Sequence, residues 1–188
     1  MKIKSIHSLL VFFLVLFSWF ILRIFMLELY SKQVKETYSL SKDQCMIELT
    51  LKQANAIIEA SFVEAKKLKL APLSVVVLDK GGHLVAFQRQ DTASILRFEI
   101  AFAKAYGALG MGMGSRGLAE KAKEMPDFMR GAIDASKGRL IPAPGGVLIL
   151  NEHNRVIGAV GVSGDTSDHD ERAAVMGIQS VGWASKVD

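Results

Sequence analysis

The chain has 188 residues, of which 50% are hydrophobic and 22% charged, so it is long enough for one packed domain and long-range disorder is excluded. Its single cysteine excludes an internal disulfide and a thiolate zinc cluster built from this chain alone. Residues 1–45 hold six basic and three acidic residues, whereas residues 46–188 hold seventeen and sixteen. The net charge of +4 therefore lies mainly at the N-terminus, and no nucleic-acid-binding footprint is expected in the folded part.

The N-terminal segment is predicted to be a membrane anchor. A basic flank over residues 1–8 precedes a nearly unbroken apolar run over residues 9–27, in which Arg23 is the only charged residue. Nineteen residues approach the ~20 that span a bilayer, and an arginine at the edge can snorkel. No small residues suited to signal-peptide cleavage follow the run. We therefore expect one uncleaved N-terminal segment to attach the chain to a membrane.

Met46 supports a competing interpretation. It opens the segment MIELTLKQAN, which is typical of the start of a soluble domain. If translation begins there, the anchor is absent and the protein is cytoplasmic. Under the first interpretation, residues 28–47 are a polar connector between the anchor and a domain over residues 48–188.

The first half of this domain is predicted to be a helix followed by a β-hairpin. Thr50 and Gln53 have the spacing of a capping box, and apolar residues then recur at helical spacing. A run of β-branched residues predicts a buried strand, and Gly81-Gly82 supplies the positive φ that a tight turn requires. The expected helix, first strand, turn and second strand cover residues 50–70, 73–78, 79–82 and 83–88.

The second half predicts three helices, a second hairpin and a closing helix. The helices cover residues 94–109, 116–125 and 127–135, the strands 147–150 and 156–162, and the closing helix 169–184 with Ser167 or Asp168 as its cap. Because the strands come in adjacent pairs, this order favours an α+β domain with a largely antiparallel sheet. A parallel sheet with crossover helices is disfavoured.

A glycine-rich segment over residues 112–117 has the spacing of a dinucleotide-binding fingerprint. That fingerprint must follow a strand, whereas this segment follows a predicted helix, so we interpret the match as chance. Its main-chain N–H groups suit an anion beside Arg116, although a helix stop with close packing also explains the glycines. Ser163 is not predicted to be a nucleophile, because Asp165 stands where the elbow motif needs glycine.

Acidic residues gather at the start of the closing helix. With His169 they offer oxygen and imidazole ligands that suit a hard or borderline metal ion, but acids at a helix start also favour capping and complement the helix dipole. No second cluster of defined spacing accompanies them, so no catalytic or metal-ligating set is assigned. The acidic residues are Asp165, Asp168, Asp170 and Glu171.

Methionines and basic residues offer groups that could bind haem or a small acid. Met111 and Met113 could ligate a haem iron, although methionines at helical spacing are more often core filler. Arg97 and Lys104 are seven residues apart, hence on one helix face, and Arg116 follows. These cations suit a carboxylate, either a haem propionate or a small acid, or they form an exposed helix face.

Several separated segments together resemble the GlcG/HbpS-like family, whose haem-binding or haem-degrading domain is also the C-terminal domain of some PduO-type proteins. The segments are SVVVLDKGGHLVAFQRQD, the helix with Glu99-Ile100-Ala101 and Lys104-Ala105, PGGVLIL, and VIGAVGVSGDTSDHDERAAVMG. The resemblance covers about residues 48–185. It implies a profilin-like α/β/α sandwich with a five-stranded antiparallel sheet, a homo-oligomer and haem as cofactor.

The resemblance makes an oligomeric haem-binding protein the leading hypothesis, with haem breakdown or redox sensing as its roles in some relatives. The alternative is an accessory protein or enzyme of glycolate or propanediol metabolism, in which the basic residues hold a small hydroxy acid or aldehyde and Asp170 or His169 moves a proton. The third hypothesis is a purely structural module that only assembles. Haem-binding relatives can use a histidine on the first helix, whereas Leu51–Leu70 contains none. The expected cofactor-binding residues are Arg97, Lys104, Met111, Met113, Arg116, Gly145 and Gly146.

Overall fold

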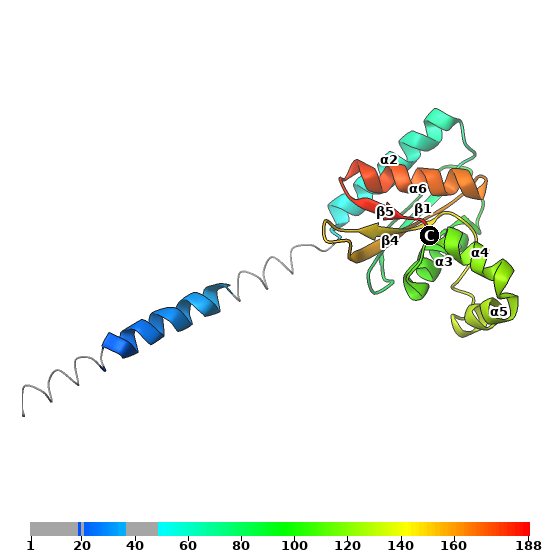
Figure 1. The fold of residues 1–188 in the computed structure, drawn as a ribbon. Coiled ribbons are helices and arrows are strands. Elements are labelled where there is room, and N and C mark those ends of the chain that lie inside the picture. The colour runs from blue at the N-terminus through cyan, green and yellow to red at the C-terminus, as the bar shows by residue number, and fades with distance from the viewer. Residues whose placement is uncertain (1–18, 20, 37–48) are drawn as a thin grey trace, which may run out of the picture. The chain divides into compact units, whose positions relative to one another are not determined.

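The structure, a computed structural model, describes residue 19, residues 21–36 and residues 49–188 (Figure 1). The chain divides into two compact units, of which the second spans Glu48–Asp188. In the first unit, residues 21–36 form a helix. All the elements discussed below belong to the second unit.

The predicted membrane attachment through residues 9–27 is corrected by the structure. In the part of the chain that it describes, none of the helices combines the length and the apolar character needed to cross a membrane. The helix over residues 21–36 continues well past the apolar run and includes Arg23, Glu28, Lys32, Lys35 and Glu36. Residues 1–18 and 20, and the alternative start at Met46, lie outside the described residues.

The second unit is an antiparallel sheet covered by helices, which confirms the predicted fold class. Its five strands are ordered β2-β1-β4-β3-β5, and all four neighbouring pairs are antiparallel. The elements are α2 (Leu51–Leu68), β1 (Ser74–Asp79), β2 (Leu84–Arg89), α3 (Arg97–Met111), α4 (Ser115–Glu124), α5 (Pro126–Ala135), β3 (Gly146–Leu150), β4 (Val156–Ser163), α6 (Ser167–Ser180) and β5 (Ala184–Lys186).

Local chemistry sets the first helix and the first hairpin as the sequence predicts. The Thr50 side chain accepts a hydrogen bond from the Gln53 N–H, and the Gln53 side chain accepts one from the Thr50 N–H, which completes the capping box. In the β1–β2 turn, Gly82 has φ 78°. The carboxylate of Asp79 accepts hydrogen bonds from the Gly81 and His83 N–H groups, so this side chain holds the turn closed.

The end of the chain differs from the prediction. Thr166 caps α6, in place of the expected Ser167 or Asp168, and its hydroxyl accepts a hydrogen bond from the His169 N–H. The helix ends at Ser180, and Gly182 with φ 82° turns the chain so that β5 pairs with β3. A strand of three residues is too short to show an alternating pattern, which is why the sequence suggested a longer helix instead.

The sheet separates two hydrophobic layers. Helices α2 and α6 lie on one face and α3 on the other (Figure 1), and successive side chains of β1 alternate between them. Val75 and Val77 pack in the α2–α6 layer, whereas Val76 and Leu78 pack in the α3 layer. Because β1 is buried on both faces, its sequence is a continuous apolar run.

A third, smaller apolar cluster holds α4 and α5 together beside α3. Its buried members are Leu118, Met129 and Leu140, and Met111 and Met113 pack partly buried against them. These methionines fill the space between α4, α5 and the end of α3, a role that their flexible side chains suit.

Two glycines allow α3 to lie directly on the sheet. A Cβ atom at Gly161 would overlap the main-chain oxygen of Ala101, and one at Gly146 would overlap that of Lys104. Both glycines are paired with each other across β3 and β4. The close approach of helix and sheet therefore requires a residue without a side chain at both positions.

We predict that Gly161→Ala destabilises the fold by about 1–3 kcal/mol or more, because the added methyl group pushes α3 away from the sheet. The matched control is Gly131→Ala in α5, where a Cβ atom meets nothing within 4 Å. This control should be neutral or stabilise by about 0.5–1 kcal/mol, since alanine favours a helix. Urea unfolding of both variants measures the difference, and an equal response of the two would contradict the packing argument.

Candidate functional site

The predicted site residue Lys104 lies inside the protein and is paired with an acid. Its side chain projects from α3, is 4% exposed, and places Nζ 2.8 Å from Oδ2 of Asp170, which is 2% exposed, at the start of α6. The ammonium group also donates to the main-chain oxygen of Val162 at 3.1 Å. Burial raises the pKa of the Asp170 carboxyl above its usual value, although the Lys104 ammonium favours the ionised form.

The predicted residues Gly145 and Gly146 close over this ion pair. Gly145 has φ 118°, and a Cβ atom there would lie 2.9 Å from Nζ of Lys104 and 3.0 Å from Cβ of Asp170. The Gly145 oxygen accepts a hydrogen bond from the Val162 N–H at 2.8 Å. The Gly146 N–H donates to the hydroxyl of Ser115 at 2.7 Å, which ties the start of α4 to the same place. Gly145 therefore leaves room for the ion pair itself, and Gly146 for the main chain of α3 at Lys104.

Arg116, the third predicted cation, is also committed to acids of α6. Its Nε donates to Oε1 of Glu171 at 2.9 Å, and its Nη2 forms an ion pair with Asp168. These two carboxylates raise the pKa of Arg116 above its usual value, and Arg116 in turn lowers the pKa of Asp168. The guanidinium therefore joins α4 to the first turn of α6.

Arg97 contacts the same region through a neutral partner. Its Nη1 donates to the hydroxyl of Ser163 at 3.3 Å, at the end of β4. The three predicted basic residues thus converge on one segment, residues 162–171, as the helical spacing suggested for Arg97 and Lys104. We call the group formed by Arg97, Lys104, Arg116, Asp168, Asp170 and Glu171 the charged clasp.

Asp165 and His169, two candidate metal ligands in the sequence, contact each other and the main chain. Nδ1 of His169 lies 2.8 Å from Oδ1 of Asp165, whose carboxylate also accepts hydrogen bonds from the Ala71 and Thr166 N–H groups. These contacts, above all the Ala71 N–H, hold the pKa of Asp165 well below its usual range. Within residues 49–188 no group of three His, Cys, Asp or Glu side chains is placed to hold a metal ion.

The charged clasp leaves little free charge for a ligand. Two of its three cations already face this chain's own carboxylates, so a propionate or a small acid there would compete with Asp170 or Glu171. The methionines expected nearby are Met111 and Met113, which pack in the α4–α5 cluster. Binding of a small hydroxy acid and formation of a homo-oligomer stay predictions.

A second candidate site is a groove of about 760 Å³ between the end of α2 and the end of β2. Its apolar walls include Phe62, Val63, Leu70 and Pro72. Three cations also line it, Lys66 and Lys69 from the end of α2 and Arg89 from the end of β2. The volume lies within the roughly 300–1,000 Å³ usual for small-molecule sites.

The sequence alone does not identify this groove, which we call the α2–β2 groove. The signal in the sequence was the group of lysines over residues 66–69, two residues after Phe62-Val63. Lysines are common in the last turn of a helix because they complement its dipole, so the run does not by itself indicate a ligand. Only the fold brings Arg89 to the same place.

We predict that Lys104→Met destabilises the protein by about 3–5 kcal/mol near neutral pH, because it leaves the buried Asp170 carboxylate without its partner. The double variant Lys104→Met/Asp170→Asn should recover part of this loss, since it buries no unpaired charge. In the single variant burial still raises the pKa of Asp170, so the contribution of this carboxyl to stability is greatest at low pH and falls as the pH rises through that pKa.

Urea unfolding at acidic and at neutral pH measures both effects. The double variant should show the smaller pH dependence because it carries no titrating group at position 170. A single variant that is as stable as the parent at neutral pH would contradict the structural role of the ion pair.

Comparisons with known proteins identify the family of this fold. A family model described as haem degrading protein HbpS-like matches residues 49–179. An uncharacterised 15.0 kDa protein from the dhaT-dhaS intergenic region of Citrobacter freundii is 34% identical over 137 residues, which cover 72% of this chain and 93% of that protein.

Solved structures show the same architecture. Protein ORFY of Klebsiella pneumoniae is 27% identical with a TM-score of 0.64, over 72% of this chain and 92% of that one. The PduOC–heme complex has 21% identity and a TM-score of 0.67, over 73% of this chain and 98% of that one, and at this identity it shows the fold alone. By its fold and by these matches, the chain belongs to the HbpS-like family of haem-degrading proteins.

Proposed function

We propose that residues 49–188 form a haem-binding protein and that the α2–β2 groove is its site. The family supports the class of ligand, and a solved structure of similar fold is a heme complex. The observation that carries the location is the combination of apolar walls with three cations in one groove. A flat apolar ring with two carboxylates matches that combination.

The cations of the groove are free to pair with propionates. Among the described residues, none of Lys66, Lys69 and Arg89 forms an ion pair with a carboxylate. They differ in this from Lys104 and Arg116, whose charges are already matched inside the protein. Asp91 is the one acid that lines the groove, so the site keeps a net positive charge.

The walls are suited to one face of a porphyrin ring. Phe62 is partly buried against the α2–α6 layer, so its ring is held from behind, whereas Val63 is 54% exposed. Leu70 and Pro72 continue the apolar surface where the chain leaves α2. Gln90 fixes the far wall, because its side-chain oxygen accepts the Leu73 N–H at 2.8 Å and its own N–H donates to the Leu73 oxygen.

Bound haem would supply the redox and oxygen chemistry of its iron, on which haem breakdown or redox sensing depends. The part of this chain is to remove the ring from water and to pair the propionates. No ligand is assigned to the charged clasp. Its role is to keep the fold that presents the groove.

We predict that hemin added to the purified protein gives a saturable, shifted Soret band at micromolar concentration. The triple variant Lys66→Ala/Lys69→Ala/Arg89→Ala should bind hemin about tenfold more weakly. Two exposed ion pairs to propionates together contribute roughly 1–2 kcal/mol, and 1.4 kcal/mol corresponds to a factor of ten.

The matched control is Lys52→Ala/Lys137→Ala/Arg155→Ala, which removes two exposed lysines and one exposed arginine outside the groove. Lys69 and Lys137 both have positive φ, 55° and 56°, so the two triple variants carry the same backbone strain. A parent protein without a saturable Soret shift would refute haem binding. Equal weakening in both triple variants would remove the groove as the site.

A further inference from the structure

We infer that the described residues of the second unit, 49–188, give a haem bound in the α2–β2 groove no axial ligand. The inference rests on the proposed haem function and concerns the iron alone. It follows from the chemistry of the side chains that line the groove and from the positions of the possible iron ligands elsewhere in the described part of this unit.

The side chains around the groove are of the wrong kinds to ligate iron. Protein ligands to haem iron are imidazole, thiolate, thioether and phenolate groups. The described residues that line the groove are phenylalanine, valine, alanine, leucine, proline, lysine, arginine, glutamine and aspartate. A lysine ammonium or an arginine guanidinium carries donors only and has no lone pair to offer. The groove therefore provides ring contacts and propionate partners without an iron ligand.

The histidines of the second unit belong to other parts of the fold. His83 lies in the β1–β2 turn with Nδ1 3.3 Å from Asp79, and His153 follows β3 with Nε2 3.6 Å from Glu152. His169 lies in the first turn of α6 and binds Asp165. None of the three lines the groove.

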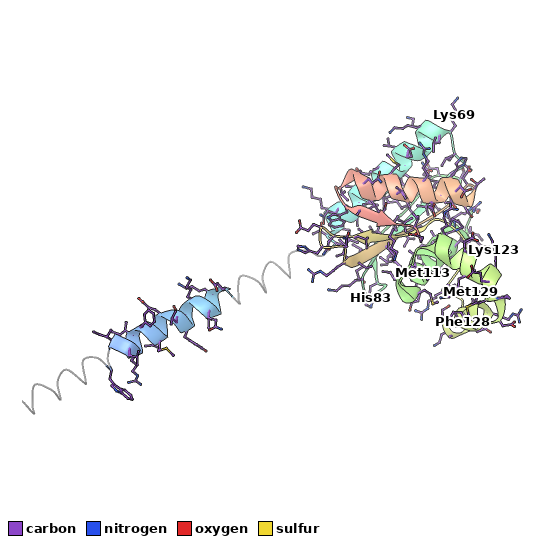
Figure 2. The ribbon with its side chains drawn as sticks, viewed as in Figure 1. Lys69, His83, Met113, Lys123, Phe128 and Met129 are labelled. Carbon is purple, nitrogen blue, oxygen red and sulfur yellow. The ribbon has the colours of Figure 1, made fainter. Side chains whose placement is uncertain are left out.

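The methionines of the α4–α5 cluster are also remote. Figure 2 shows Lys69 at the end of α2, whereas Met113, Met129 and His83 lie on the opposite side of the unit. Met113 and Met129 pack within the α4–α5 cluster, which adjoins α3 on the other face of the sheet. A methionine of this cluster could reach the groove only by leaving the cluster and crossing the sheet. Met176 lies on α6, on the same face of the sheet as α2, and it does not line the groove; nor do Met125 and Tyr106.

Haem bound in this way would be held through its ring face and its propionates. Its iron would be open to water or to a small external ligand. Affinity then rests on apolar contact and on two exposed ion pairs, so it is modest. An external imidazole should strengthen binding, because it supplies the coordination that the groove lacks. The ferric iron should be high-spin in its absence.

The test uses the full chain loaded with hemin, observed by absorption, electron paramagnetic resonance and resonance Raman spectroscopy. We expect a high-spin ferric spectrum, no iron–histidine stretching band in the ferrous protein, and conversion to a low-spin spectrum by imidazole with at least tenfold tighter hemin binding. Replacement of His83, His153 or His169 by alanine should leave these spectra unchanged.

A gain-of-ligand variant tests the location independently. Val63→His places an imidazole on an exposed position that lines the groove, and it should give a red-shifted Soret band and tighter binding without added imidazole. The matched control, Leu51→His, adds a histidine at an equally exposed apolar position at the other end of α2 and should leave the spectrum of the parent.

Each outcome bears on a separate statement. A low-spin parent spectrum, or its loss in one histidine variant, overturns the inference while haem binding stands. Absence of any saturable hemin binding overturns the proposed function itself. If Val63→His and Leu51→His respond alike, haem is not held against this part of α2, and the inference falls with the location.

Discussion

The buried ion pair between Lys104 and Asp170 is the constraint on which the architecture depends. Lys104 comes from α3 on one face of the sheet, and Asp170 from α6 on the other, so the pair joins the two layers around the ends of β3 and β4. Two buried charges are costly unless they meet with good geometry and further hydrogen bonds. Here Val162 and the Asp165 N–H supply those bonds, so the layers have one well-defined arrangement.

Glycines in β3, in β4 and directly before β3 are the condition for that contact. Gly146 and Gly161 let α3 lie against the sheet, and Gly145 leaves room for the ammonium group beside the Asp170 methylene. A larger residue at any of them would lift the helix or displace the ion pair. Glycine at these places is therefore a packing requirement. For this reason, a resemblance to a family that is carried by glycine-rich segments supports the fold of the chain more directly than its function.

The sequence predicted what depends on neighbouring residues and missed what depends on distant ones. The capping box of α2, both hairpins and the break at Pro126 follow from local chemistry and were correct. Lys104 and Asp170 are 66 residues apart, and sequence spacing does not reveal a contact at that separation. Lys104, Arg97 and Arg116 were therefore expected to face a ligand, whereas each has a partner within the chain. Likewise, Lys66 and Lys69 resemble any helix end until the fold adds Arg89 beside them.

The contacts that hold the fold together and the groove proposed to bind haem lie in separate parts of this unit. The Lys104–Asp170 pair of the charged clasp is buried, and the clasp ties three helices to the sheet, whereas the cations of the α2–β2 groove are exposed and form no ion pair with the described residues. Substitution of an exposed wall residue such as Val63 leaves the core intact. The residues of α2 that line the groove can therefore change without any change in the sandwich, because they belong to a surface that the fold already presents.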